Sequence, residues 1–292
     1  MADKKVESVK HSASTEQGKM SNGARPKLPV RRIIRGICGT IVLLAWTALV
    51  IFLSNFVVVN VFVAILGMET AQEPMWEGMI FALVYVMAVL LTIVIPPKVI
   101  KWLKLTPESR KNLDREKASR SEKKANRTAL GLNGWPTWAD IGLAPVGYVV
   151  YFLLAMGAVA IFSNFPWFDA EEKQELAYET TVVGWDRIIA FISYVVIAPI
   201  AEELIFRGWL YGKLREKFSE NMSKWGGMVL AIFLVSLLFA LVHQTLVVGV
   251  CVFMLSIVLC ALREITGTIY AGILVHMIVN GVAFYQNYIA QM

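Results

Sequence analysis

The sequence predicts an all-α fold, a polytopic transmembrane bundle of about seven to eight membrane helices that follows a disordered, basic N-terminal tail. Three observations predict it: an apolar composition, apolar runs of membrane-crossing length, and alternating charge between those runs. Of the 292 residues, 57% are hydrophobic and 17% are charged, whereas a soluble domain has about 25% charged residues. Too little polar surface is left to coat a water-soluble globule. We therefore exclude a soluble enzyme, a disordered chain and a nucleic-acid-binding module.

The expected helices follow a polar tail. Residues 1–30 are rich in Lys, Ser, Glu and Gly and cannot bury enough apolar surface to offset the entropy of ordering, so we expect a disordered cytoplasmic tail. A membrane-crossing helix needs about 20 apolar residues. Runs of this kind follow at 37–66, 76–97, 141–164, 187–207, 227–243, 246–262 and 268–290. The first run is longer than one crossing needs and contains Asn55 and Asn60. Its helix could therefore be tilted or broken, and an eighth span is possible.

The charges between the runs predict the orientation of the bundle, because Lys and Arg beside membrane helices mark the cytoplasmic side. Residues 1–36 carry nine basic and three acidic residues, and residues 98–127 carry eleven and four. Residues 169–187, by contrast, carry two and six. We therefore expect a cytoplasmic N-terminus. We attribute the net charge of +6 to membrane topology rather than to a nucleic-acid partner.

This pattern divides the chain into the tail (1–30), N-terminal membrane helices (31–98), a basic cytoplasmic loop (99–129) and a second membrane domain (130–292). The basic loop includes Lys117, Arg120, Lys123 and Lys124. Basic residues near a membrane surface attract anionic lipids at about 1 kcal/mol each, which makes such lipids candidate partners. A role in topology alone explains the same charges, and we favour it.

Charged side chains inside the spans are functional candidates, because each costs about 2.5–3.5 kcal/mol at a helix centre. Glu203 and Arg207 are four residues apart, on one helix face, with the acid nearer the N-terminus, which is the better orientation for an ion pair. Glu202 is rotated by about 100° from Glu203. We therefore expect a structural ion pair and one carboxylate, Glu202, without that partner.

Two further helices each carry a pair of candidate side chains on one face. The i, i+4 spacing aligns Phe239 with His243 and His276 with Asn280. A lone buried histidine is usually structural, and an asparagine in a membrane helix often bonds a neighbouring helix. An unpaired glutamate, two histidines and an asparagine on three helices are harder to explain as separate structural features.

Together these side chains suit hydrolysis. A carboxylate and an imidazole that share a proton can activate water, and Glu202 with His243 would form that pair. His276 and Asn280 would donate hydrogen bonds to a developing oxyanion, an effect worth about 2.7–4 kcal/mol per donor. The sequence contains no GxSxG, HExxH or GxGD-type aspartate pair, which disfavours the serine, metallo and aspartyl intramembrane proteases.

The polar residues form three motifs, Glu202-Glu203-x-x-x-Arg207, Phe239-x-x-x-His243 and His276-x-x-x-Asn280. In this order they resemble the motifs of the CPBP family, which comprises type II CAAX prenyl endopeptidases and bacteriocin-processing or immunity (Abi) proteins, also called intramembrane glutamic endopeptidases. The resemblance covers roughly residues 130–290. It implies an all-helical catalytic membrane domain over 130–292, with its site in a cavity that opens toward the cytosol.

By this resemblance Glu202 would be the catalytic carboxylate and His243 its partner on the attacking water. His276 and Asn280 would stabilise the oxyanion, with Glu203, Arg207 and Phe239 in support. The reaction would need no metal or other cofactor. The substrate would be a membrane-delivered peptide or protein, of the CAAX type or a bacteriocin or signal-peptide precursor. The loops are short and the membrane core carries no added domains, which favours a location in a prokaryotic cell membrane.

Three alternatives stay open. Two histidines and one glutamate also match the ligand set of a catalytic zinc site, although Asn280 is a poor zinc ligand. The polar cluster of an immunity or binding protein would only hold three helices together. Intramembrane Glu and His are also typical of proton-coupled transporters, but the sequence shows no sign of inverted repeats.

The depths of the two proposed partners conflict if the helices are ideal. Glu202 would lie near the cytoplasmic end of the span 187–207, whereas a straight helix that starts at Gly227 carries His243 toward the opposite side. A break at Pro199 would reconcile the depths, as would a helical extension through residues 210–218.

Overall fold

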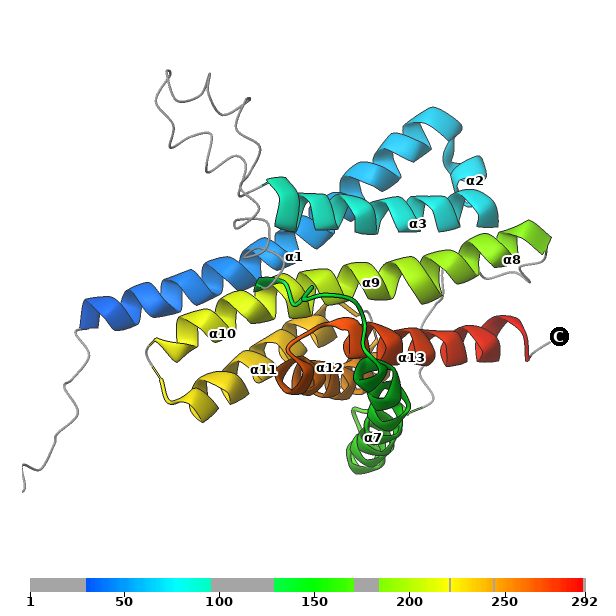
Figure 1. The fold of residues 1–292 in the computed structure, drawn as a ribbon. Helices are drawn as coiled ribbons and strands as arrows, with labels where there is room; N and C mark the ends of the chain where they lie inside the picture. Colours follow the sequence, from blue (N-terminus) through cyan, green and yellow to red (C-terminus); the bar gives the residue numbers. More distant parts are fainter. Residues whose placement is uncertain (1–29, 96–128, 171–183, 221, 244, 291–292) are drawn as a thin grey trace, which may run out of the picture.

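The computed structural model describes residues 30–95, 129–170, 184–220, 222–243 and 245–290 (Figure 1). Almost all of the predicted tail (1–30) and of the predicted basic loop (99–129) therefore lies outside the described residues. Every regular element within the described ranges is helical, and no strand occurs there. The predicted all-α fold class is confirmed.

The elements are α1 (Val30–Leu66), α2 (Met68–Ala71), α3 (Pro74–Val89), the π-helical η1 (Leu90–Val94), α7 (Trp138–Phe162), α8 (Gly184–Phe191), the π-helical η2 (Ile192–Ile197), α9 (Ala198–Glu202), the π-helical η3 (Glu203–Tyr211), α10 (Gly212–Ser219), α11 (Lys224–Leu241), α12 (Leu246–Thr266) and α13 (Tyr270–Tyr288). The segments from α8 to α10 follow one another without a break and form one long helix.

Six helices of the described part are long and apolar enough to cross a membrane, at 36–66, 74–94, 138–162, 184–219, 224–241 and 246–266. They correspond to the first six predicted spans. The seventh predicted span forms α13, which has 19 residues but is not among the six. Four polar side chains, His276, Asn280, Gln286 and Asn287, interrupt its apolar sequence.

The structure shows whether the first and fourth predicted spans are broken. The first span is a single helix of 37 residues, in which Asn60 Nδ2 donates to the Phe56 carbonyl at 2.6 Å, so this amide is satisfied within the helix. The fourth span continues through Ser219 as a helix of 36 residues that contains Pro199 without ending there. The helical extension, and not a break at Pro199, therefore places Glu202 near the middle of its span.

The long α8–α10 helix lies at the centre of the bundle (Figure 1), with α1 and α3 on one side of it and α11 and α13 on the other. Its side chains Ile205, Phe206, Leu210 and Leu214 are at most 1% exposed. They belong to one core cluster with residues from α1, α3, α11 and α12. Burial of apolar surface on both sides thus fixes the segment that carries Glu202 and Glu203.

The outer surface of the bundle is apolar, and exposed tryptophans lie near the ends of several helices. Large apolar side chains remain exposed along the spans, as Phe52, Leu153 and Ile161 do. Exposed tryptophans lie at or beside the ends of helices α7, α8 and α11: Trp135, Trp138, Trp167, Trp185 and Trp225. Tryptophans at the ends of apolar helices are typical of the membrane–water interface. The chain is an integral membrane protein.

Polar contacts fix the start of α13 against α7. Thr137 caps α7 and forms a capping box with Asp140. The same carboxylate, only 1% exposed, accepts a hydrogen bond from Thr268 Oγ1 at 2.9 Å. The backbone N–H of Ile269 donates to the carbonyl of Gly131 at 3.1 Å. These contacts fix the depth from which His276, about two turns further along α13, projects into the bundle.

Candidate active site

The two adjacent glutamates lie where the long helix changes its winding. Glu202 ends α9 and Glu203 begins η3, whose nine residues are π-helical. Pro199 precedes them and cannot donate a backbone hydrogen bond to the preceding turn. The short α9 is flanked by two π-helical segments, η2 and η3. Irregular winding of this kind occurs frequently at functional sites.

The predicted ion pair is present in the buried core. Arg207 Nη1 lies 2.8 Å from Glu203 Oε1, and both side chains are fully buried. The guanidinium carbon lies 4.4 Å from the centroid of the Phe239 ring, a favourable cation–π position. Glu203 and Arg207 thus neutralise each other against an aromatic side chain from α11.

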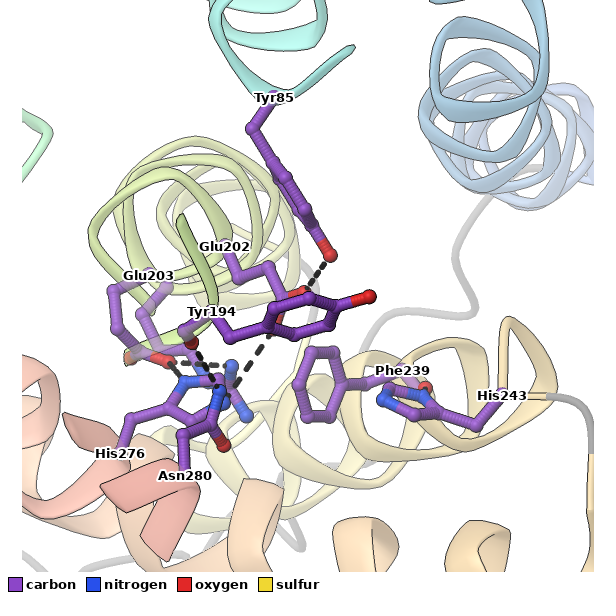
Figure 2. Close-up of polar contacts among 9 residues, drawn as sticks. Tyr85, Tyr194, Glu202, Glu203, Phe239, His243, His276 and Asn280 are labelled. Carbon is purple, nitrogen blue, oxygen red and sulfur yellow. Dashed lines mark hydrogen bonds and ion pairs between the residues drawn. The ribbon is translucent and has the colours of Figure 1, made fainter. Parts of the chain in front are cut away.

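His276 lies between the two carboxylates (Figure 2). Its Nδ1 is 3.1 Å from Glu203 Oε1, and its Nε2 is 3.5 Å from Glu202 Oε2. Gly272, one turn earlier on α13, allows this close approach, because a Cβ atom at that position would lie only 3.1 Å from Glu203 Oε2. Helix α13 can therefore approach the paired acids closely enough for one imidazole to contact both.

Glu202 has a second partner, which comes from α3. The hydroxyl of Tyr85 donates a hydrogen bond to Glu202 Oε1. As expected, Glu202 does not pair with Arg207. Its carboxylate nevertheless has two other partners, Tyr85 and His276. The Glu202 side chain is 12% exposed, against 4% for His276 and none for Glu203. Glu202 is therefore the most accessible of the three.

The structure does not bring His243 into contact with Glu202, and no hydrogen bond or ion pair joins the two side chains in the described part of the chain. His243 Nδ1 lies 2.7 Å from the Phe239 carbonyl. The Phe239 ring is edge-on to both imidazoles, 5.1 Å from His243 and 5.9 Å from His276 between ring centroids. Because a carbonyl oxygen only accepts, Nδ1 carries the hydrogen and Nε2 is left as an acceptor in neutral His243.

Asn280 binds the backbone of the long helix. Its Nδ2 donates to the carbonyl of Tyr194 in η2 at 2.9 Å, and Figure 2 shows the amide beside His276 on α13. One of the two N–H groups of the amide is thus engaged. The other is the group that would remain for an oxyanion.

Part of the chain is similar to a known family of membrane proteins. Residues 184–282 match the Rce1-like family model of type II CAAX prenyl endopeptidases. No curated protein and no solved structure matches the chain. The match supports the family resemblance that the three motifs indicate, and it identifies a segment related to membrane endopeptidases.

The Rce1-like segment contains all seven site residues that the sequence predicts, from Glu202 to Asn280. Tyr85 lies outside it, and sequence reasoning did not single it out. The only signal was a hydroxyl-bearing ring within an apolar span, and the sequence gives no indication of its partner. Tyr194, whose backbone carbonyl binds Asn280, was missed because a backbone acceptor leaves no trace in the sequence.

The hydrogen bonds of Glu203 decide which nitrogen of His276 faces Glu202. Glu203 accepts from Arg207 and from His276 Nδ1, so Nδ1 of the imidazole carries a hydrogen. The remaining imidazole nitrogen, Nε2, faces Glu202 Oε2. His276 therefore presents Nε2 to the carboxylate of Glu202.

The described part of the chain contains no group of three or more His, Cys, Asp or Glu side chains arranged to hold a metal ion. Histidine side chains such as that of His243 can adopt other rotamers, and another rotamer would change which groups could bind zinc. A chelator therefore tests the zinc-dependent alternative.

Replacing Gly272 by Ala tests the close approach of α13 to Glu203. We expect a loss of about 1–3 kcal/mol in the free energy of unfolding, because the new methyl group would displace a buried carboxylate. Gly157→Ala is the matched control, since a Cβ atom there meets nothing within 4 Å and alanine stabilises a helix relative to glycine. Thermal unfolding of both variants in detergent measures the difference. Equal stability of the two variants would contradict the packing described here.

Proposed function

We propose that this chain is a membrane-embedded endopeptidase in which Glu202 activates water to cleave a peptide or protein delivered through the membrane. The observation that carries the proposal is the position of His276 between Glu202 and Glu203. Arg207 neutralises Glu203, so Glu202 is the carboxylate that remains for chemistry. The match of residues 184–282 to a family of CAAX prenyl endopeptidases agrees with this reaction class.

Each step of the hydrolysis balances with these groups. Glu202 accepts a proton from water while the water oxygen bonds to the carbonyl carbon of the substrate. The carbonyl oxygen becomes an oxyanion that needs hydrogen-bond donors. When the tetrahedral intermediate collapses, the carbon–nitrogen bond breaks and the leaving amine takes the proton held by Glu202 and His276. The products are a carboxylic acid and an amine.

The other predicted residues have roles consistent with their positions. His243 keeps an open acceptor nitrogen and would hold the second hydrogen of the attacking water. Asn280 would offer its remaining N–H group to the oxyanion. In this structure the partner in contact with Glu202 is His276 rather than His243, so we assign His276 to the proton pair first.

The family match and the membrane setting support the substrate classes that we propose. A CAAX-type protein or a bacteriocin or signal-peptide precursor would reach Glu202 near the middle of its span. We further propose a prokaryotic cell membrane, a cytoplasmic N-terminus, and anionic lipids as candidate partners of the basic loop. The reaction would use no metal or other cofactor.

A non-catalytic immunity or binding protein is the second candidate. Tyr85 on α3 and His276 on α13 both contact Glu202, and the cluster thereby links three helices of the bundle. Such contacts would stabilise the bundle without any reaction. In that case Glu202→Gln would keep the function of the protein.

The experiment that tests the proposal is cleavage of a library of membrane-anchored reporter peptides by the purified protein in detergent. Wild type is compared with Glu202→Gln and His243→Ala, each with and without a strong zinc chelator. Glu216→Gln is the matched control, because Glu216 lies on the same long helix and its side chain is 69% exposed.

We expect cleavage that resists the chelator, persists in Glu216→Gln and is lost in Glu202→Gln and in His243→Ala. Cleavage that the chelator abolishes would favour the zinc-dependent alternative. A folded wild type that cleaves no peptide in the library would favour the binding protein.

A further inference from the structure

A residue from outside the Rce1-like segment completes the site. Tyr85 lies on α3, in the N-terminal pair of long helices, 117 positions from Glu202 in the sequence. Figure 2 shows its ring pointing from α3 toward the carboxylate of Glu202, on the side away from His276. Its hydroxyl donates to Glu202 Oε1. The two oxygens of one carboxylate thus face two different helices.

The position of Tyr85 is fixed by its neighbours. Its ring lies edge-on to Phe81, one turn earlier on α3, at 5.0 Å between ring centroids. Phe81 stacks on Tyr194 of η2 at 4.1 Å. Next to Tyr194, Ser193 Oγ donates to the Gly78 carbonyl at 2.9 Å, and this bond is buried. These contacts attach α3 to the long helix and leave the phenol little freedom.

The two contacts of Glu202 differ in strength. The Tyr85 hydroxyl donates a hydrogen bond to Oε1, whereas Oε2 lies 3.5 Å from His276 Nε2, beyond the usual range of an N–H···O bond. A carboxylate held firmly at one oxygen cannot rotate freely, so the other oxygen keeps a defined direction. Oε2, the loosely held oxygen beside the proton-sharing imidazole, is then the one positioned to take a proton from water.

We propose that Tyr85 is a positioning residue for Glu202, which holds Oε1 through its hydroxyl and thereby directs Oε2 toward the attacking water. The catalytic consequence rests on the proposed function. The orientation of the carboxylate does not, since it follows from the contact alone. The endopeptidase site therefore requires α3 as well as the Rce1-like segment.

Tyr85→Phe tests the proposal because it removes the hydroxyl and keeps the ring that contacts Phe81. We expect kcat to fall by about 10- to 100-fold, the value of a hydrogen bond to a charged group, with KM unchanged, since the hydroxyl acts on the base and not on substrate binding. Tyr285→Phe is the matched control, because Tyr285 is 56% exposed on α13.

A second measurement needs no enzymatic activity. The infrared carboxyl bands of Glu202, assigned by the difference between wild type and Glu202→Gln, should shift in Tyr85→Phe and stay in place in Tyr285→Phe. Tyr85→Leu separates ring from hydroxyl: kcat should fall at least as far as in Tyr85→Phe, with an added loss of stability from the missing ring.

Wild-type kcat in Tyr85→Phe, or an unshifted Glu202 band, would overturn the proposal. A parallel rise in KM would also overturn it, because it would indicate a substrate contact instead. A wild type that cleaves nothing would overturn the proposed function and the kinetic role of Tyr85 together. The infrared band would then still decide whether Tyr85 orients Glu202.

Discussion

Glu202→Gln is expected to lower the cleavage rate by about 10²–10⁴-fold, the usual contribution of a general base. Glutamine keeps the shape of the side chain, and its carbonyl can still accept the hydrogen bond from Tyr85. It cannot take a proton from water or share one with His276. The change therefore removes the chemistry and leaves the contacts of the carboxylate largely in place.

Single-turnover cleavage of a reporter peptide measures this loss, and thermal unfolding in detergent shows whether the variant is folded. Glu216→Gln, with its exposed carboxylate on the same helix, should match wild type in both assays. A folded Glu202→Gln variant that retains a tenth or more of the wild-type rate would contradict the role of Glu202 as the base.

Arg207→Met is expected to destabilise the protein by about 3–5 kcal/mol, because it removes the guanidinium that neutralises the buried carboxylate of Glu203 and leaves only the contact with His276. Both side chains of this ion pair are fully buried. The guanidinium also lies 4.4 Å from the Phe239 ring, so its removal empties space against α11. Unfolding in detergent, by heat or denaturant, measures the change.

Two further variants isolate the charge effect. The double variant Glu203→Gln/Arg207→Met should recover a large part of the lost stability, because no unpaired charge stays buried. Lys213→Met breaks the ion pair with Glu216, which is exposed and on the same long helix, and should change stability by no more than about 1 kcal/mol. If Arg207→Met behaves like Lys213→Met, the buried pair is not a principal support of the site.

Much of this protein follows from its sequence alone. The apolar runs predicted helices that the structure contains, because a helix is the only isolated segment that satisfies its own backbone hydrogen bonds within lipid. The ion pair of Glu203 and Arg207 was predictable because both partners lie on one helix at a fixed spacing. The motifs from Glu202 to Asn280 likewise indicated the family whose model matches residues 184–282.

The contacts between side chains of different helices were decided only by the tertiary structure. The packing of α13 at Gly272 places His276 against Glu202, while Phe239 lies between His276 and His243. Tyr85 reaches Glu202 because α3 packs on the long helix. Helix periodicity specifies which residues share a face. The rotation and depth of one helix against another depend on side-chain packing over the whole interface, and no spacing within a single helix records them.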